Sequence, residues 1–227
     1  MKNFVALVGS ESSTSTNRHL LQYMKTHFSA EATIELISLT NLPIFKKTDD
    51  RFMPEPALAL IKKILPADGV IIGTPEYDHA VPALLLNALA WASYTSHPFV
   101  NKPVMITGAS YGSLGSSRAQ AQLRQVLDSP EIKARVMPGS EFLLGHSLEA
   151  FSEQGLIDEE TSQQLDGLFK DFLLFVDISA ALNNTDDIKK AQSEAFSWDD
   201  KWGISNDKIS WYRRLHCRRI IQWHTIK

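Results

Sequence analysis

Three polar turns, each placed directly after a short apolar run, constrain the fold of this 227-residue chain more than any other feature. The pairs of run and turn are residues 4–8 with 9–17, residues 70–73 with 74–79, and residues 104–108 with 110–116. Runs that are apolar at nearly every position are typical of parallel strands covered on both faces. Because the carboxyl ends of parallel strands meet at one edge of a sheet, we expect the three turns to border one ligand-binding crevice.

Segments with strand and helix patterns alternate along most of the chain. Strands are expected at residues 4–8, 33–39, 70–73, 104–108 and 134–137, with 142–144 as a candidate continuation of the last. Helices are expected at residues 17–28, 81–94, 116–127 and 165–176, and one more after the surface loop 41–56. Since crossovers between parallel strands are almost always right-handed, this alternation predicts an α/β fold. Its doubly wound five-stranded parallel sheet has the strand order 2-1-3-4-5 and helices on both faces.

Composition excludes several classes of function. A formal charge of −3 gives the chain no bulk attraction for nucleic acid. The single cysteine, Cys217, cannot form an internal disulfide, which favours a reducing compartment. The sequence shows neither a signal-peptide pattern nor an apolar stretch of spanning length, so we expect a cytoplasmic protein with no membrane partner. The seven histidines lack paired metal-ligand spacing, so no metal site is expected.

The first turn has the chemistry of an anion site. A strand-to-helix turn presents free backbone N–H groups at the positive end of a helix, and hydroxyl and amide side chains add further donors. Those side chains are Ser10, Ser13, Ser15, Thr16 and Asn17. The turn contains no lysine and no G-x-G-x-x-G pattern, so it is neither an ATPase phosphate loop nor a dinucleotide fingerprint. A simple Ser/Thr helix cap is the alternative, but one oxygen suffices for a cap, so anion binding is favoured.

The second and third turns suit a flat ligand. Pro75 and Pro82 stiffen the second turn, and Tyr77 offers an amphipathic surface on which a heterocycle can stack. Gly112 and Gly115 in the third turn allow a close approach of backbone to a ring. Each turn taken alone is equally compatible with ordinary loop packing, so the argument for a ligand depends on the ordered set of three.

These residues resemble those of the NAD(P)H-dependent FMN reductases of flavodoxin-like fold, a family that includes quinone, azo-dye and chromate reductases. The resemblance covers approximately residues 4–176 and is most specific in the second turn and the helix after it. The matching residues are Gly9, Ser10, Ser15, Asn17, Pro75 to His79, Val81, Pro82, Asn87 to Leu89, Trp91, Lys102 to Val104, Gly112 to Gly115, Arg118 to Gln120, Leu123 and Arg124.

The resemblance implies a bound FMN and the residues that contact it. The residues implied for the phosphate are Ser10, Ser15, Thr16 and Asn17. Those implied for the flavin ring and ribityl chain are Pro75, Glu76, Tyr77 and Asp78. Those implied for the polar edge of the ring are Gly112, Ser113 and Gly115, with Ser110 at the start of the same turn. Because the cofactor supplies the reactive centre, no catalytic acid or base is nominated.

Three positions depart from the family pattern. Ser12 stands where the family usually has arginine, Asp78 replaces a usual asparagine, and Ser116 replaces a second glycine of the third turn. The first change removes a guanidinium that could pair with a phosphate. Since a 2′-phosphate usually requires such a group, NADH is favoured over NADPH as the co-substrate.

The implied function is an FMN-dependent oxidoreductase with a ping-pong mechanism. Hydride passes from NAD(P)H through bound FMN to a small acceptor, which is a flavin, a quinone, an azo or nitro compound or a metal ion. The resemblance also implies a homodimer or homotetramer. The alternatives are a flavodoxin-type electron carrier, for which a charge of −3 is weakly acidic, and a flavin-sensing interaction module.

The C-terminal part of the chain has a different character. We expect residues 1–177 to form the FMN-binding domain and residues 178–227 to form an extension of unknown role. The extension contains four of the five tryptophans and a basic cluster, namely Trp198, Trp202, Trp211, Trp223, Arg213, Arg214, Arg218 and Arg219. An added helix or arm that packs on the domain or its partner, with solvated arginines, is favoured over a contact with an anionic ligand or nucleic acid.

Overall fold

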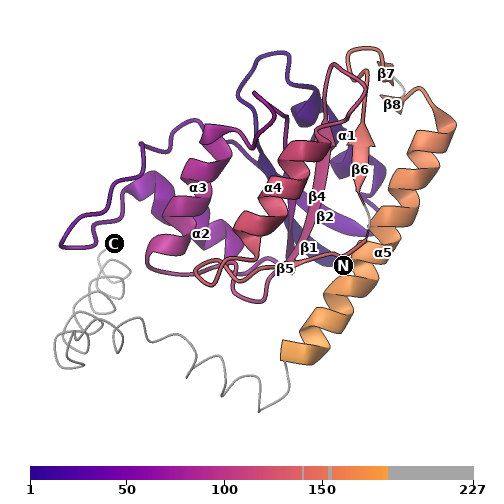
Figure 1. The fold of residues 1–227 in the computed structure, drawn as a ribbon. Helices are drawn as coiled ribbons and strands as arrows, with labels where there is room; N and C mark the ends of the chain where they lie inside the picture. Colours follow the sequence, from indigo (N-terminus) through magenta and orange to yellow (C-terminus); the bar gives the residue numbers. More distant parts are fainter. Residues whose placement is uncertain (140, 153–154, 184–227) are drawn as a thin grey trace, which may run out of the picture. The chain divides into compact units, whose positions relative to one another are not determined.

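The computed structural model describes residues 1–139, 141–152 and 155–183. The strands are β1 (Lys2–Val8), β2 (Ala32–Ile37), β3 (Gly69–Gly73), β4 (Pro103–Ala109), β5 (Arg135–Val136), β6 (Phe142–Leu144), β7 (Phe151–Ser152) and β8 (Gly155–Leu156). The helices are α1 (Thr16–His27), α2 (Glu55–Ile64), α3 (Ala83–Tyr94), α4 (Ser117–Leu127) and α5 (Glu159–Asn183). The main sheet has the order β2-β1-β3-β4-β5 with every pairing parallel, which confirms the predicted α/β fold and strand order (Figure 1).

The far edge of the sheet differs from the prediction of one fifth strand. Both β5 and β6 pair with β4, β5 at Pro103–Val104 and β6 at Thr107–Ala109. Pro138 and Gly139 lie between them, and Gly139 has a φ of 81°. A proline without an N–H and a left-handed glycine interrupt the ladder, so the edge is built from two short pieces. Strands β7 and β8, which the sequence pattern did not predict, form a small antiparallel pair.

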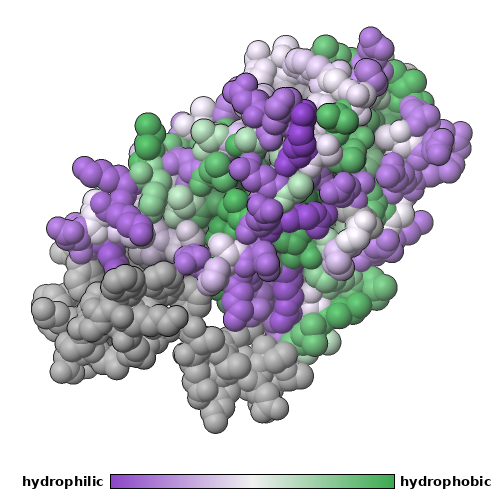
Figure 2. Space-filling view, viewed as in Figure 1, coloured by the Kyte–Doolittle hydropathy of each residue, from purple (hydrophilic) through white to green (hydrophobic). Residues whose placement is uncertain are grey.

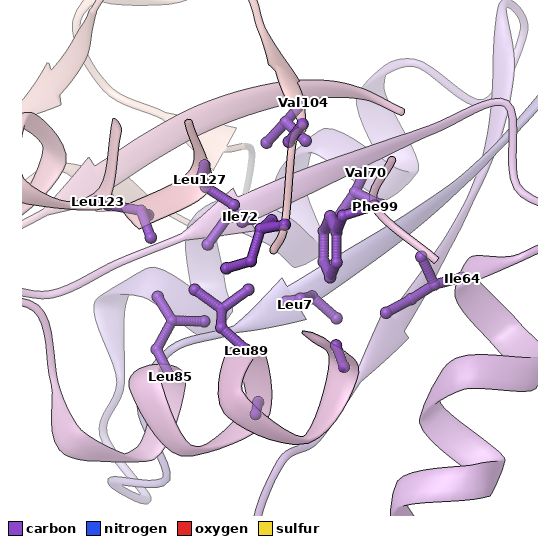
Figure 3. Packing of buried hydrophobic residues seen from close by; sticks show 14 of the residues in the cluster. Leu7, Ile64, Val70, Ile72, Leu85, Leu89, Phe99, Val104, Leu123 and Leu127 are labelled. Carbon is purple, nitrogen blue, oxygen red and sulfur yellow. The ribbon is translucent and has the colours of Figure 1, made fainter. Parts of the chain in front are cut away.

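Alternation along each strand divides the core into two layers. In β1, Val5 and Leu7 belong to the cluster under α2, α3 and α4, whereas Phe4, Ala6 and Val8 belong to the cluster under α1 and α5. Figure 3 shows the first cluster, in which helix residues gather around Leu7 and Ile72 of the sheet; they include Leu85 and Leu89 of α3 and Leu123 and Leu127 of α4. Helices therefore cover both faces of the sheet, as Figure 1 shows.

Helix α5 is longer than the segment expected at 165–176, because it begins at Glu159 and continues to Asn183. Two acidic residues open its first turn, where negative charge is favourable, although they add no apolar periodicity. The expected domain boundary at 177/178 falls inside this helix, and the division into two domains stays a prediction. The expectations for the tryptophans, the arginine cluster and Cys217 concern residues outside the described ranges.

The loop expected at 41–56 is fastened to α3. The carbonyl of Pro43 accepts hydrogen bonds from Trp91 Nε1 at 2.7 Å and Asn87 Nδ2 at 3.0 Å. The backbone N–H of Phe45 donates to Asn87 Oδ1 at 2.7 Å, and the Phe45 ring meets Trp91 and Tyr94 edge-on. This loop is therefore an ordered layer on α3, although it contains no helix or strand before α2.

The surface in view mixes hydrophilic and hydrophobic residues in small areas (Figure 2). Among the described residues, no helix combines the length and apolarity needed to cross a bilayer.

Candidate functional site

The three turns enclose one cleft of about 710 Å³ at the carboxyl edge of the sheet. The cleft is lined by Ser10, Ser12, Ser15, Thr16, Asn17, Pro75, Glu76, Tyr77, Asp78, His79, Ala109, Ser110, Tyr111, Gly112, Ser113, Leu114 and Arg118. All the predicted cofactor-binding residues except Gly115 are among them. The Cα of Gly115 packs against Leu143, since an added Cβ would lie 2.4 Å from the Leu143 carbonyl carbon, and its contact with the flavin stays a prediction.

The first turn ends at the N-terminus of α1, where Ser15 is the N-cap. Its side chain accepts a hydrogen bond from Arg18 N at 3.2 Å, and its carbonyl accepts one from His19 N at 3.1 Å. The first N–H groups of a helix have no partner within it, so those of Thr16 and Asn17 remain for a ligand. Both residues line the cleft, and together with the hydroxyls of Ser10 and Ser15 they form a donor-rich wall.

The side chain of Asn17 also forms hydrogen bonds within the protein. Its amide donates to the carbonyl of Ala109 at 2.8 Å and accepts from the N–H of Ala109 at 3.0 Å. The residue is 2% exposed. Asn17 therefore braces the start of α1 against the end of β4. Its backbone N–H and the second N–H of its amide remain as candidate donors to an anion, and the contact with FMN stays a prediction.

Replacing Asn17 by aspartate tests this brace. The carboxylate still accepts from the Ala109 N–H but places a negative oxygen against the Ala109 carbonyl, so we expect the free energy of unfolding to fall by about 2 kcal/mol. Urea unfolding at pH 7 measures the loss. The deficit relative to the unsubstituted chain should shrink in acid, where the protonated side chain donates again; an unchanged stability at pH 7 would contradict the assigned contacts.

The second turn is tight and strained. Tyr77 and Ala80 exchange two backbone hydrogen bonds of 3.2 and 2.9 Å, and the two residues between them, Asp78 and His79, have φ values of 50° and 63°. Left-handed geometry at both central positions is that of a type I′ turn, which Gly and Asn occupy most easily. Two non-glycine residues held there place strained backbone at the wall of the cleft.

Glu76 lies behind this turn with its side chain only 7% exposed. Its Oε2 accepts from the N–H groups of Arg118 and Ala119 at 3.0 and 3.3 Å, and its Oε1 accepts from Arg118 Nε at 2.6 Å. The imidazole of His79 is 3.4 Å away. Burial raises the pKa of the Glu76 carboxyl, but these hydrogen bonds outweigh it, so the pKa lies below its ordinary value.

The depressed pKa of Glu76 predicts a contribution to acid stability. A carboxyl whose pKa is lower in the folded chain stabilises the fold above its unfolded pKa of 4.5, and that contribution disappears as pH falls through the folded pKa. The free energy of unfolding should therefore decline below about pH 4.5, and Glu76→Gln should flatten the decline. Part of the slope should remain, because the pKa of Glu11 is also lowered. Urea titrations across this range that give one slope for both chains would contradict the prediction.

The third turn depends on residues that the sequence prediction did not assign to the site. Gln120 is fully buried and its amide donates to the carbonyl of Phe142 at 2.9 Å. Ser116, at a φ of 67°, is also fully buried, and its hydroxyl lies near the Gln120 amide. The stretch after β6 closes the turn from behind, since Ser147 N donates to Ser110 O at 3.0 Å. Arg118 and Gln120 lie in the stretch that resembles the family, and this resemblance was the sequence signal that could have assigned them to the site. No such signal marked Ser147.

The charge in the cleft is low. Arg118 is the only lysine or arginine among the described residues that line it, and its side chain is paired with Glu76. Arg18, at the start of α1, is 3.3 Å from Glu11, so it is not a free counter-ion for the first turn. An anion at the first turn must therefore be held mainly by N–H and O–H dipoles at the positive end of α1.

This donor set fits FMN. The first turn supplies amide and hydroxyl donors for one phosphate ester, and the third turn is open at Gly112, where an added Cβ would meet nothing within 4 Å. Exposed apolar side chains surround the rest of the cleft, namely Tyr77 at 50%, Tyr111 at 56% and Leu114 at 50% exposure. A doubly wound parallel sheet with a phosphate-ready helix terminus at its carboxyl edge defines the class of mononucleotide-binding α/β proteins.

Comparisons with known proteins agree. The family described as NADPH-dependent FMN reductase matches residues 3–149. The chain is 52% identical over 201 residues to the NADH:(hydroxy)cinnamate reductase subunit CrdA of Vibrio ruber, covering 88% of this chain and 98% of that one. It is 40% identical over 182 residues to the NADH-dependent flavin reductase subunit 2 of Lactobacillus johnsonii, covering 76% and 96%. The structure of FerB, a flavoenzyme NAD(P)H:(acceptor) oxidoreductase of Paracoccus denitrificans, has a TM-score of 0.72 at 26% identity, covering 79% and 99%.

The chain belongs to the NADPH-dependent FMN reductase family. It is an oxidoreductase of flavodoxin-like fold that uses FMN and a reduced nicotinamide nucleotide. The predicted class of enzyme and its cofactors are thereby confirmed, whereas the individual contacts to FMN stay a prediction.

Proposed function

We propose that this chain oxidises NADH by a ping-pong mechanism and passes the electrons through FMN to a flat aromatic acceptor. The observation that carries the proposal is the shared cleft, which has the N-terminus of α1 on one side and exposed apolar side chains on another. When bound there, FMN supplies the centre that accepts and donates the hydride. Every other requirement is one of binding, orientation and exclusion of water.

The three turns have different roles in binding FMN and the substrates. The N–H groups of Thr16 and Asn17, with the hydroxyls of Ser10 and Ser15, hold the phosphate. The backbone of the second turn, from Pro75 to Asp78, and that of the third turn, at Ser110, Gly112 and Ser113, contact the ring. Tyr77, Tyr111 and Leu114 are exposed by half or more, and such apolar surface next to a polar cleft suits a planar substrate. These side chains receive the nicotinamide and the acceptor in turn.

The acceptor class and the co-substrate are proposed from the relatives together with the cleft. Related proteins are named reductases of (hydroxy)cinnamate, of flavin and of 2-hydroxy-1,4-benzoquinone, all of them conjugated planar molecules. The relatives at 52% and 40% identity are both named as users of NADH. The absence of an arginine at Ser12 supports the same preference for NADH.

The assembly is proposed in the same way. Both of these relatives are named as subunits, so those proteins assemble from more than one chain. The proposal that the chains are identical here comes from the family resemblance. We propose that the chain forms a homodimer or homotetramer and that a neighbouring copy covers the apolar surroundings of the cleft. Light scattering on purified protein gives the mass directly, and a monomer at working concentration would remove this part of the proposal.

Anaerobic rapid mixing tests the function. The protein loaded with FMN should be bleached by NADH in a first phase, and the yellow absorption should return when menadione or a cinnamate is added in a second mixing step. If NADH reduces the FMN completely before any acceptor is added, the two half-reactions are separate, as a ping-pong mechanism requires. A chain that takes up no FMN, or one that is bleached only when acceptor and NADH are present together, would contradict the proposal.

A further inference from the structure

Glu76 caps a helix to which it does not belong. Helix α4 begins at Ser117, and its N-cap Ser116 makes no capping hydrogen bond because it is left-handed and its hydroxyl is buried beside Gln120. The N–H groups of Arg118 and Ala119 would then lack partners. Both donate to Oε2 of Glu76, a residue 42 positions earlier in the chain than Arg118. A carboxylate from the second turn therefore satisfies the start of the helix that follows the third turn.

The same carboxylate holds Arg118. Its Oε1 accepts from Arg118 Nε at 2.6 Å and is also paired with Arg118 Nη2. The two side chains differ in exposure, at 7% for Glu76 and 46% for Arg118. The buried partner has one ionic and two backbone anchors, so it is the fixed member, and the arginine at the cleft is oriented by it.

Two walls of the cleft are joined by these contacts. The second turn contributes Glu76, and the third turn runs directly into the first residues of α4. Within the described part of the chain, Glu76 is the side chain that accepts from the N–H groups of Arg118 and Ala119. The ionisable residues of the second turn that line the cleft together with this pair are Asp78 and His79, and His79 Nδ1 is 3.4 Å from Glu76 Oε1.

We propose that Glu76 is a positioning residue for the flavin site. It fixes the third turn through the N-terminus of α4, and its negative charge balances that of Arg118, which lines the cleft. The inference rests on the proposed function, because it assigns Glu76 a role in that same cleft. The backbone of Glu76 keeps the direct contact proposed above, whereas its side chain acts on the flavin indirectly.

Glu76→Gln and Arg118→Met test the proposal together. Glu76→Gln keeps the shape and removes the charged cap, so we expect the dissociation constant for FMN to rise about tenfold. Arg118→Met keeps the cap and should raise it about threefold. The reduction potential of bound FMN should rise in Glu76→Gln, because the positive charge of Arg118 is then unbalanced. It should fall in Arg118→Met, because the negative charge of Glu76 is then unbalanced. A merely structural role for the pair would shift both potentials the same way.

The control is Glu35→Gln, which removes a carboxylate paired with Lys63 on the surface outside the cleft. It should leave both the affinity for FMN and the potential unchanged. Glu76→Gln with the affinity of the unsubstituted chain, or two potentials that move together, would overturn the role of Glu76. Failure of the unsubstituted chain to bind FMN would overturn the proposed function itself, so the two failures are distinguishable.

Discussion

Alanine at Gly108 is expected to lower the free energy of unfolding by about 3 kcal/mol, because the residue faces a fully occupied polar layer. An added Cβ would lie 1.8 Å from Ser116 Oγ, 2.7 Å from the Thr74 carbonyl oxygen and 2.8 Å from Gln120 Nε2. Ser116 and Gln120 are both 0% exposed and cannot move into solvent. The carbonyl of Thr74 belongs to the backbone, which can shift even less than the side chains of Ser116 and Gln120. The third turn must therefore shift as a unit or the strand must bend.

Gly112 provides the matched control, since an added Cβ there meets nothing within 4 Å. Gly112→Ala should change the free energy of unfolding by less than about 0.5 kcal/mol. Urea unfolding followed by circular dichroism compares the two variants under one condition. Equal stability of the two would show that the layer below the third turn is not packed as described.

Riboflavin is expected to bind at least about a hundredfold more weakly than FMN, because the first turn is proposed to hold the phosphate that riboflavin lacks. Two free N–H groups and two hydroxyls converge at the start of α1, and a hydrogen bond to a charged partner contributes more than a neutral one. The cleft offers no unpaired lysine or arginine among its described lining residues, so the difference should depend only weakly on salt.

Fluorescence titration of each flavin measures the ratio of the two dissociation constants. Ser110→Ala serves as the control, because Ser110 lies on the wall of the third turn and its loss should affect both flavins equally. Ser15→Ala should instead reduce the ratio, since it removes the cap and one donor at the phosphate. Affinities for riboflavin and FMN within threefold of each other would place the phosphate elsewhere.

The sheet could be predicted because its central strands are buried on both faces and are therefore apolar throughout. Residues 4–8 and 70–73 lie as expected within β1 and β3. The strands at the far edge of the sheet were harder to predict, because β5 has two residues and β6 has three, and such short strands show no periodicity. The extent of α5 was underestimated because its ends carry polar or solvent-exposed residues, and only the buried stripe in its middle was visible in the pattern.

The location of the site could be predicted from the sequence, but not which of its side chains face the ligand and which bind other parts of the protein. Turns that follow parallel strands must converge, so the cleft followed from the strand order. Whether a polar side chain faces a ligand or the protein depends on partners distant in sequence. Asn17 is bound to Ala109, 92 residues away, and Glu76 to the start of α4, 42 residues away. Gly115 packs on Leu143 because β6 pairs with β4 beside it, and its expected contact with the ring stays a prediction.

The capping of α4 by Glu76 also bears on which flavin nucleotide the protein selects. Two helices begin at this cleft, and an internal carboxylate already satisfies one of them. A single positive terminus matches the lone phosphate of a mononucleotide. The pyrophosphate of a dinucleotide such as FAD carries a second phosphate, for which the described residues that line the cleft offer no other free helix N-terminus and no unpaired lysine or arginine, so we expect FMN to bind in preference to FAD.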